Sequence, residues 1–205
     1  MPQLENLDVR MYDGVGQYRI PVIQPIHELP QIDKWMEFEY AKNKRHKPKN
    51  TGVHFFQEDF KFESVWNFPD RYTNVLLNYS CVLAPDFSIY VNIPPALQIY
   101  NHYRKHWLAA YWQEKGITVI PVINWGYEDT YEWCFDGEPM NSIIATSNVG
   151  CYQDKELKSM WLKGYDKMLE VLNPHKILFY SNSYPENLDG NIHFIKYNID
   201  KSIGR

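Results

Sequence analysis

The sequence predicts an α/β protein whose mostly parallel sheet has five or six strands and flanking helices, in an open or partial-barrel arrangement. Short apolar runs that end in small or polar residues lie at 81–88, 117–126, 142–150 and 176–182, and a helix or loop follows each. Strand-like and helix-like segments alternate from residue 53 to residue 198, which favours consecutive βα units. Five or six strands are too few for a closed eight-stranded barrel.

Residues 1–50 differ in character from the rest and are predicted to form an irregular N-terminal extension packed on an α/β domain of residues 51–205. Residues 18–24 have strand character, but Pro21 interrupts them, which suits an edge strand or an irregular segment. Residues 29–41 are predicted as a short helix with Pro30 near its first turn.

Within the α/β domain the pattern predicts the elements in turn. A first strand at 53–59 ends in two carboxylates, and helical pattern follows at 62–67 and 70–79. The longest predicted helix covers 94–115, because it opens with prolines and stops at Gly116. A second amphipathic helix covers 155–172, and a last strand is predicted at 191–197.

Composition bounds the partners that the chain can recruit. The formal net charge is −4, so no global basic field attracts nucleic acid. One basic stretch is interpreted either as a solvated linker or as a nucleic-acid contact: Lys42, Lys44, Arg45, Lys47 and Lys49. The 3 cysteines lack metal-type spacing, and no apolar run reaches the ~20 residues that span a bilayer. We therefore expect a soluble, cytoplasmic protein with no membrane partner.

Polar residues gather where the predicted parallel strands end, which is the usual place for a site in such a sheet. Asp59 and Asp86 come from neighbouring units, and paired carboxylates serve acid/base hydrolysis or hold a divalent cation. We predict these two as catalytic residues. The predicted substrate-binding residues are Glu58, Asn124, Trp125, Ser147 and Asn148. Alternatively, each aspartate caps the next helix or turn by accepting hydrogen bonds from backbone N–H groups.

Standard nucleotide and metal motifs are missing from the sequence. The polar loop at 147–150 could cradle an anion, but it lacks the spacing of a P-loop. His102 and His106 share one helix face, yet Arg104 and Lys105 lie between them, and there is no His-Glu-x-x-His motif. We therefore predict these histidines as surface or boundary residues, and assign neither a metal site nor a cofactor.

Several distinct motifs occur between about residues 52 and 182. They are HFFxxDxxFxxVW from His54, PDFSxY from Pro85, QIYNxYRxxW from Gln98, VIPVxxWG from Val119 and FDGxP from Phe135. Together they resemble a domain-of-unknown-function family found in phages, prophages, plasmids and Firmicutes genomes. The resemblance implies a mobile-element context and assigns no catalytic residue.

Three hypotheses of function follow. The leading one is a phage- or mobile-element-associated hydrolase that acts on a phosphorylated or nucleic-acid substrate at the acidic strand-end site. The alternative is a non-enzymatic protein that uses its aromatic side chains, 16% of the sequence, to bind a host protein or a small nucleotide signal. Such binding could counter a bacterial defence. A third is a replication or packaging accessory that contacts DNA through residues 42–49.

Overall fold

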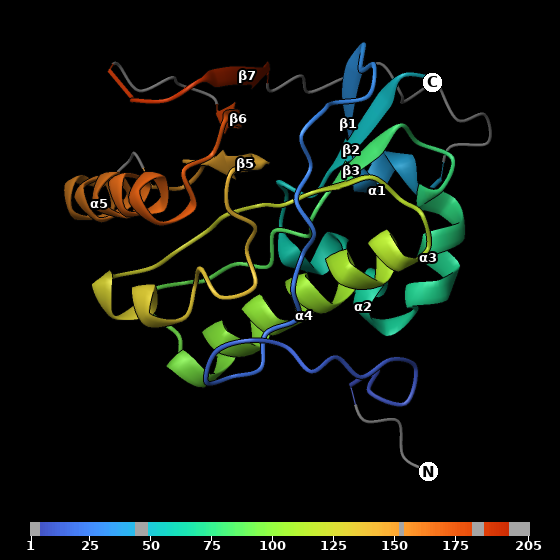
Figure 1. The fold of residues 1–205 in the computed structure, drawn as a ribbon, viewed down its shortest axis with the longest axis horizontal. Coiled ribbons are helices and arrows are strands. Elements are labelled where there is room, and N and C mark those ends of the chain that lie inside the picture. The colour runs from blue at the N-terminus through green and yellow to red at the C-terminus, as the bar shows by residue number, and fades with distance from the viewer. Residues whose placement is uncertain (1–4, 44–48, 152–153, 182–186, 197–205) are drawn as a thin grey trace.

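The computed structural model describes residues 5–43, 49–151, 154–181 and 187–196 of the chain. Within these residues, seven strands form two parallel sheets (Figure 1). The first sheet contains β1 (Lys34–Glu37), β2 (Thr51–His54), β3 (Cys81–Leu83) and β4 (Val119–Ile120). The second contains β5 (Ile143–Ser147), β6 (Lys176–Ser181) and β7 (Ile192–Lys196).

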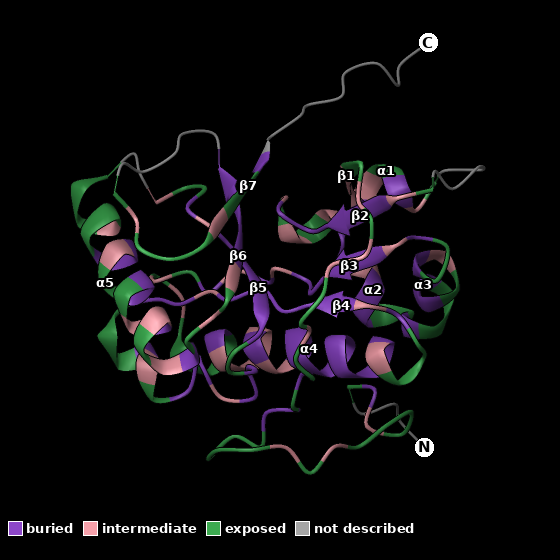
Figure 2. Ribbon diagram, turned by 45° about the horizontal axis from the view of Figure 1, so that its top comes forward, coloured by how far each residue is buried: buried purple, intermediate pink, exposed green. Residues whose placement is uncertain are grey.

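The two sheets continue one another, so the strand order follows the chain order. A parallel bridge between Val122 and Ala145 joins them just beyond β4. Figure 2 shows the strands as an open arc that runs from β1 round to β7. Among the described residues β1 and β7 do not pair with each other, so the sheet is not a closed barrel. The predicted open, parallel α/β architecture is confirmed.

Strand β1 lies in the segment predicted as a helix, and that prediction is wrong for residues 34–37. Strand β1 pairs in parallel with β2, in a register that places Trp35 opposite Gly52. A Cβ atom at Gly52 would lie 2.5 Å from the Trp35 ring, so the glycine makes room for the indole. Pairing and packing override the helical pattern here, and only α1 (Phe38–Ala41) is helical in this segment.

The N-terminal residues before β1 pack along the long helix α4 (Pro95–Glu114). Val15 and Ile20 form an isolated antiparallel bridge, and residues 18–24 form no strand. Ile20 is fully buried, and the side chain of Gln113 exchanges two hydrogen bonds with the backbone of Gln24. These contacts fix an irregular segment against the α/β layers, although it lacks a regular ladder of its own.

Helices cover the outside of the arc, as Figures 1 and 2 show. Besides α1 and α4 they are α2 (Ser64–Asn67), α3 (Pro69–Leu76) and α5 (Lys155–Leu172), with 3₁₀ turns η1 (Asp59–Lys61) and η2 (Glu128–Glu132). Asp154 caps α5 by accepting from two backbone N–H groups, and left-handed Asn173 ends it. None of the helices in the described part of the chain is long and apolar enough to cross a bilayer.

Aromatic rings fill the interior of the arc. The ring of Tyr180, on β6, stacks on Phe56 with a centroid distance of 4.7 Å and lies 5.0 Å from the ring of His54 on β2. Leu178 and Ile195 of the second sheet also belong to the main buried cluster around the first sheet. The walls of the arc are therefore packed against each other, and the carboxyl ends of their strands open on the same side.

Candidate functional site at the carboxyl edge of the strands

A cavity of about 450 Å³ lies at the carboxyl ends of the strands. Every strand from β1 to β6 contributes a residue at or just after its end, in strand order Glu37, Glu58, Asp86, Asn124, Ser147 and Tyr180. This is the position expected for a site in a parallel α/β sheet. The cavity is therefore the main candidate for the functional site.

Most of the predicted site residues line this cavity, but two do not. The lining residues are Glu58, Asp86, Asn124, Trp125 and Ser147. Asn148 is buried outside the lining. Asp59 also lies outside it, and its carboxylate accepts a hydrogen bond from the Ser88 hydroxyl at 2.8 Å and another from the Ser88 backbone N–H at 3.1 Å. Asp59 thus holds the distant loop after β3, and not the next helix or turn along the chain that the capping alternative assigned to it.

Asp86 is the carboxyl group with the most altered proton affinity in the cavity. Burial and the nearby negative charge of Asp59 raise the pKa of Asp86 to about 7, while Lys105 and a hydrogen bond from Asn124 oppose that rise. The Asn124 side-chain N–H donates to Asp86 Oδ1 at 3.1 Å and to the Phe87 carbonyl at 3.0 Å. Asp86 is therefore oriented and can gain or lose a proton near neutral pH.

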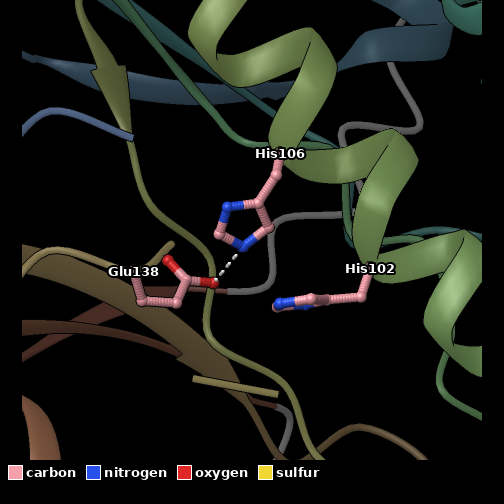
Figure 3. A group of neighbouring side chains, drawn as sticks. All are labelled: His102, His106 and Glu138. Atoms are coloured by element: carbon pink, nitrogen blue, oxygen red, sulfur yellow. Dashed lines mark hydrogen bonds and ion pairs between the residues drawn. The ribbon is translucent and has the colours of Figure 1, made fainter. Parts of the chain in front are cut away.

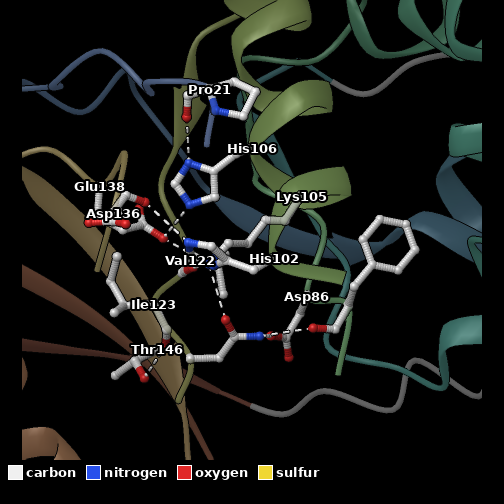
Figure 4. A network of polar contacts seen from close by, with 12 residues as sticks. Pro21, Asp86, His102, Lys105, His106, Val122, Ile123, Asp136, Glu138 and Thr146 are labelled. Atoms are coloured by element: carbon white, nitrogen blue, oxygen red, sulfur yellow. Dashed lines mark hydrogen bonds and ion pairs between the residues drawn. The ribbon is translucent and has the colours of Figure 1, made fainter. Parts of the chain in front are cut away.

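Lys105 connects this carboxyl group to the interior, as the polar network in Figure 4 shows. Its side chain comes from α4, is fully buried, and donates to Asn124 Oδ1 at 3.0 Å and to the Val122 carbonyl at 2.8 Å. A third bond, of 2.7 Å, goes to Glu138 Oε1. The sequence alone does not predict this role, because a lysine on a long helix normally faces water.

The rest of the lining combines flat aromatic surfaces with unpaired polar groups. Gln57 belongs to the lining, and both of its side-chain polar atoms are buried without a hydrogen-bond partner among the described residues. Burial raises the pKa of Glu37, whereas Glu58 is held by Lys61 at 2.6 Å. Trp125 reaches the cavity but is only 6% exposed. Neither Glu37 nor Gln57 was predicted as a site residue. Glu37 precedes the predicted α/β domain, and no functional motif singles out Gln57.

Trp125 is held mainly by packing against α5. A Cβ atom at Gly164 would lie 2.1 Å from the indole, so this helical glycine lets Trp125 approach the helix closely. The Trp161 ring lies 5.6 Å away on the same helix, and its indole N–H donates to the Ser147 carbonyl at 2.8 Å. Trp125 and Ser147 therefore share a wall of the cavity that α5 fixes in place.

The prediction that His102 and His106 are surface or boundary residues is wrong. His102 and His106 are 1% and 0% exposed, so they are neither surface nor boundary residues. This face of α4 is covered by the N-terminal extension and by the loop after η2, from which Glu138 reaches His106 (Figure 3). Only tertiary packing brings Glu138 there, 32 residues along the chain from His106.

The basic stretch contributes little to the described site. Lys42 donates to the Lys61 carbonyl at 3.2 Å, and its ammonium lies 5.7 Å from the Phe38 ring centroid. Lys49 precedes β2. Lys44, Arg45 and Lys47 lie outside the described residues.

The chain is similar to proteins of two mycobacterial phages and matches one protein family. The sequence profile of a family described as "Domain of unknown function (DUF4417)" matches residues 12–198. The Gene 1 protein of Mycobacterium phage L5 is 34% identical over 181 residues, which are 87% of this chain and 78% of that protein. The Gene 1 protein of Mycobacterium phage D29 is 32% identical over 181 residues, 87% of this chain and 66% of that protein. No solved structure matches the chain.

Proposed function

This chain belongs to the DUF4417 family of phage-associated proteins, and on that premise we propose that it is a hydrolase of a phosphorylated or nucleic-acid substrate in the host cytoplasm. The observation that carries the proposal is Asp86, an oriented carboxyl group at the cavity whose pKa is raised to about 7. A group with that pKa can act as general acid or base at neutral pH. Family membership agrees with the resemblance carried by the motifs.

The other lining residues have distinct roles in this proposal. Asn124 orients Asp86, and the mostly buried Tyr180 and Trp125 rings supply apolar lining. Asp59 is a positioning residue, because Ser88 occupies both of its carboxylate oxygens. Among the described lining residues the carboxylates outnumber the cations, so a phosphorylated substrate is expected to enter with a divalent cation such as Mg²⁺.

The test compares Asp86→Asn with wild type on a panel of nucleotides, cyclic dinucleotides and single-stranded oligonucleotides, with Mg²⁺ or Mn²⁺. We expect wild-type turnover of at least one class and a loss of roughly 100-fold or more in Asp86→Asn. Asp166→Asn, an exposed position on α5, is the matched control and retains full turnover. Equal turnover in Asp86→Asn and wild type contradicts the catalytic role of Asp86.

A second candidate function is binding without turnover, of a small nucleotide signal or of a host protein, as in an anti-defence protein. It is favoured by the aromatic and unpaired amide lining of the cavity, which can hold a base without a second catalytic carboxylate. Under this alternative a nucleotide raises the melting temperature of wild type while no product forms. Gln57→Leu then abolishes the shift, whereas Asp166→Asn keeps it.

A further inference from the structure

Three buried side chains with metal-binding atoms meet behind the cavity. His102 and His106 lie on successive turns of α4, and Glu138 follows η2 (Figure 3). One ligand atom from each residue lies within 4.8 Å of the other two. The side chains of His106 and Glu138 are fully excluded from solvent. The cluster is therefore separate from the solvent-accessible lining of the cavity.

The backbone fixes which nitrogen of each imidazole carries a proton. His102 Nε2 lies 3.1 Å from the carbonyl oxygen of Asp136, and His106 Nδ1 lies 2.8 Å from that of Pro21. A carbonyl oxygen only accepts, so both of these nitrogens donate. The lone pairs are then left on His102 Nδ1 and His106 Nε2. Metal-binding histidines are usually oriented by such N–H bonds to backbone carbonyls.

Each residue of the cluster offers a lone pair that the protein does not satisfy. His102 Nδ1 and Glu138 Oε2 have no hydrogen-bond partner among the described residues. His106 Nε2 faces Glu138 Oε1 at 3.0 Å, which sets one acceptor against another. Buried acceptors without a donor cost free energy. A cation in their midst would satisfy all three residues at once.

We propose that His102 Nδ1, His106 Nε2 and the Glu138 carboxylate bind a divalent first-row transition-metal ion. Two imidazole nitrogens and one carboxylate form a donor set typical of zinc, whereas Mg²⁺ and Ca²⁺ prefer oxygen ligands alone. Lys105 already holds Glu138 Oε1, which leaves Oε2 for the ion. Metal bonds of about 2.0–2.2 Å would draw the ligand atoms to roughly 3.3 Å from one another.

A proton alone accounts for the cluster less well. A doubly protonated His106 would donate to Glu138 Oε1 and would satisfy that contact alone. It would leave His102 Nδ1 and Glu138 Oε2 without partners. A metal ion explains why all three residues converge. It also accounts for His102, which forms no hydrogen bond with Lys105 or Glu138.

The first experiment measures metal in the intact wild-type chain. Elemental analysis after purification without chelator is expected to find close to one equivalent of a first-row transition metal per chain. Chelation should lower the melting temperature, and adding Zn²⁺ alone should restore it, because an ion that binds only the folded state stabilises it. Under a tenth of an equivalent of metal, with no shift on adding Zn²⁺, overturns the proposal.

Variants then locate the ion. We expect His102→Gln and Glu138→Gln to reduce metal content at least tenfold. His54→Gln is the matched control, because His54 is also a buried histidine whose Nδ1 lacks a partner, yet it lies outside the cluster. Equal metal loss in His54→Gln and His102→Gln overturns the assignment. If the cluster variants fail to fold, the Zn²⁺ titration of the wild-type chain still decides.

Discussion

Asp86 makes the stability of the protein depend on pH. Burial and Asp59 raise its pKa to about 7, so the folded chain binds this proton more tightly than the unfolded chain does. The resulting stabilisation is fully present below about pH 4 and is lost as the pH rises through about 7. We expect the free energy of unfolding to decline over that window by at most about 4 kcal/mol, an upper limit because the cavity solvates the side chain.

Urea unfolding at intervals between pH 4 and pH 8 measures this decline. Asp86→Asn is uncharged at every pH, so its profile should lack the decline, while Asp166→Asn should keep it. Parallel profiles for wild type and Asp86→Asn would mean that Asp86 titrates in the ordinary range of an aspartate.

Two hydrogen bonds from Ser88 hold the Asp59 carboxylate, and the free energy of this pairing can be measured. Removing either partner leaves a polar group without its bond, so Asp59→Ala and Ser88→Ala should each destabilise the fold. In a double-mutant cycle we expect a coupling of about 1 kcal/mol, because the hydroxyl bond is lost once and not twice. The backbone N–H bond of Ser88 persists in Ser88→Ala. If the losses of unfolding free energy in the two single variants add up to the loss in the double variant, the hydroxyl contact contributes no stability.

Single residues differ in how far sequence alone can place them. Asp86 and Asn124 directly follow apolar runs that begin with β3 and β4, so their position at the sheet edge could be predicted from the order of residues alone. Sequence alone could not show that Asp86 faces the cavity and Asp59 does not, because this depends on the hydrogen bonds between Ser88 and Asp59. Lys105 and Glu138 were out of reach, since their burial depends on segments that are distant in the chain.

At the scale of elements, β1 depends on the fit of one indole against one glycine. A methyl group at Gly52 would collide with the Trp35 ring, so Gly52→Ala should lower the free energy of unfolding by about 1–3 kcal/mol. In a Trp35→Ala background the same substitution should cost much less, because the obstructing ring is gone. Denaturant unfolding of the four chains measures both costs. If Gly52→Ala is equally destabilising in the Trp35→Ala background, the strain lies in the β2 backbone and not in the contact with the indole.

The elements that the sequence predicts best have local signals at both ends. Helix α5 begins at a capping aspartate and ends at a left-handed asparagine, and both signals are local. Strand β1 has only four residues and no such signal, and it becomes a strand by pairing with β2. Short elements defined by their neighbours are therefore the ones that a single sequence misassigns.

At the scale of the whole molecule, the alternation of strands and helices was enough to predict a parallel sheet, but not its curvature. The arc is set by contacts across its interior, where Tyr180 on β6 meets Phe56 beyond β2. Those positions are more than a hundred residues apart in the chain. The same contacts join the two sheets, whose only described backbone link besides the chain itself is the bridge at Val122 and Ala145.

The two sheets should therefore unfold as one unit, and Tyr180 should be central to that cooperativity. Tyr180→Ala removes a buried ring, so we expect a loss of about 3–5 kcal/mol of unfolding free energy. Phe194→Ala is the matched control on the neighbouring strand β7; its ring is 42% exposed, and its loss should be clearly smaller. Far-ultraviolet circular dichroism and tryptophan fluorescence should report coincident transitions in wild type. Two outcomes would contradict this prediction: separate unfolding transitions in wild type, or equal losses of unfolding free energy in the two variants. Either would mean that the two sheets are independently stable and that only the strand ends hold the cavity between them.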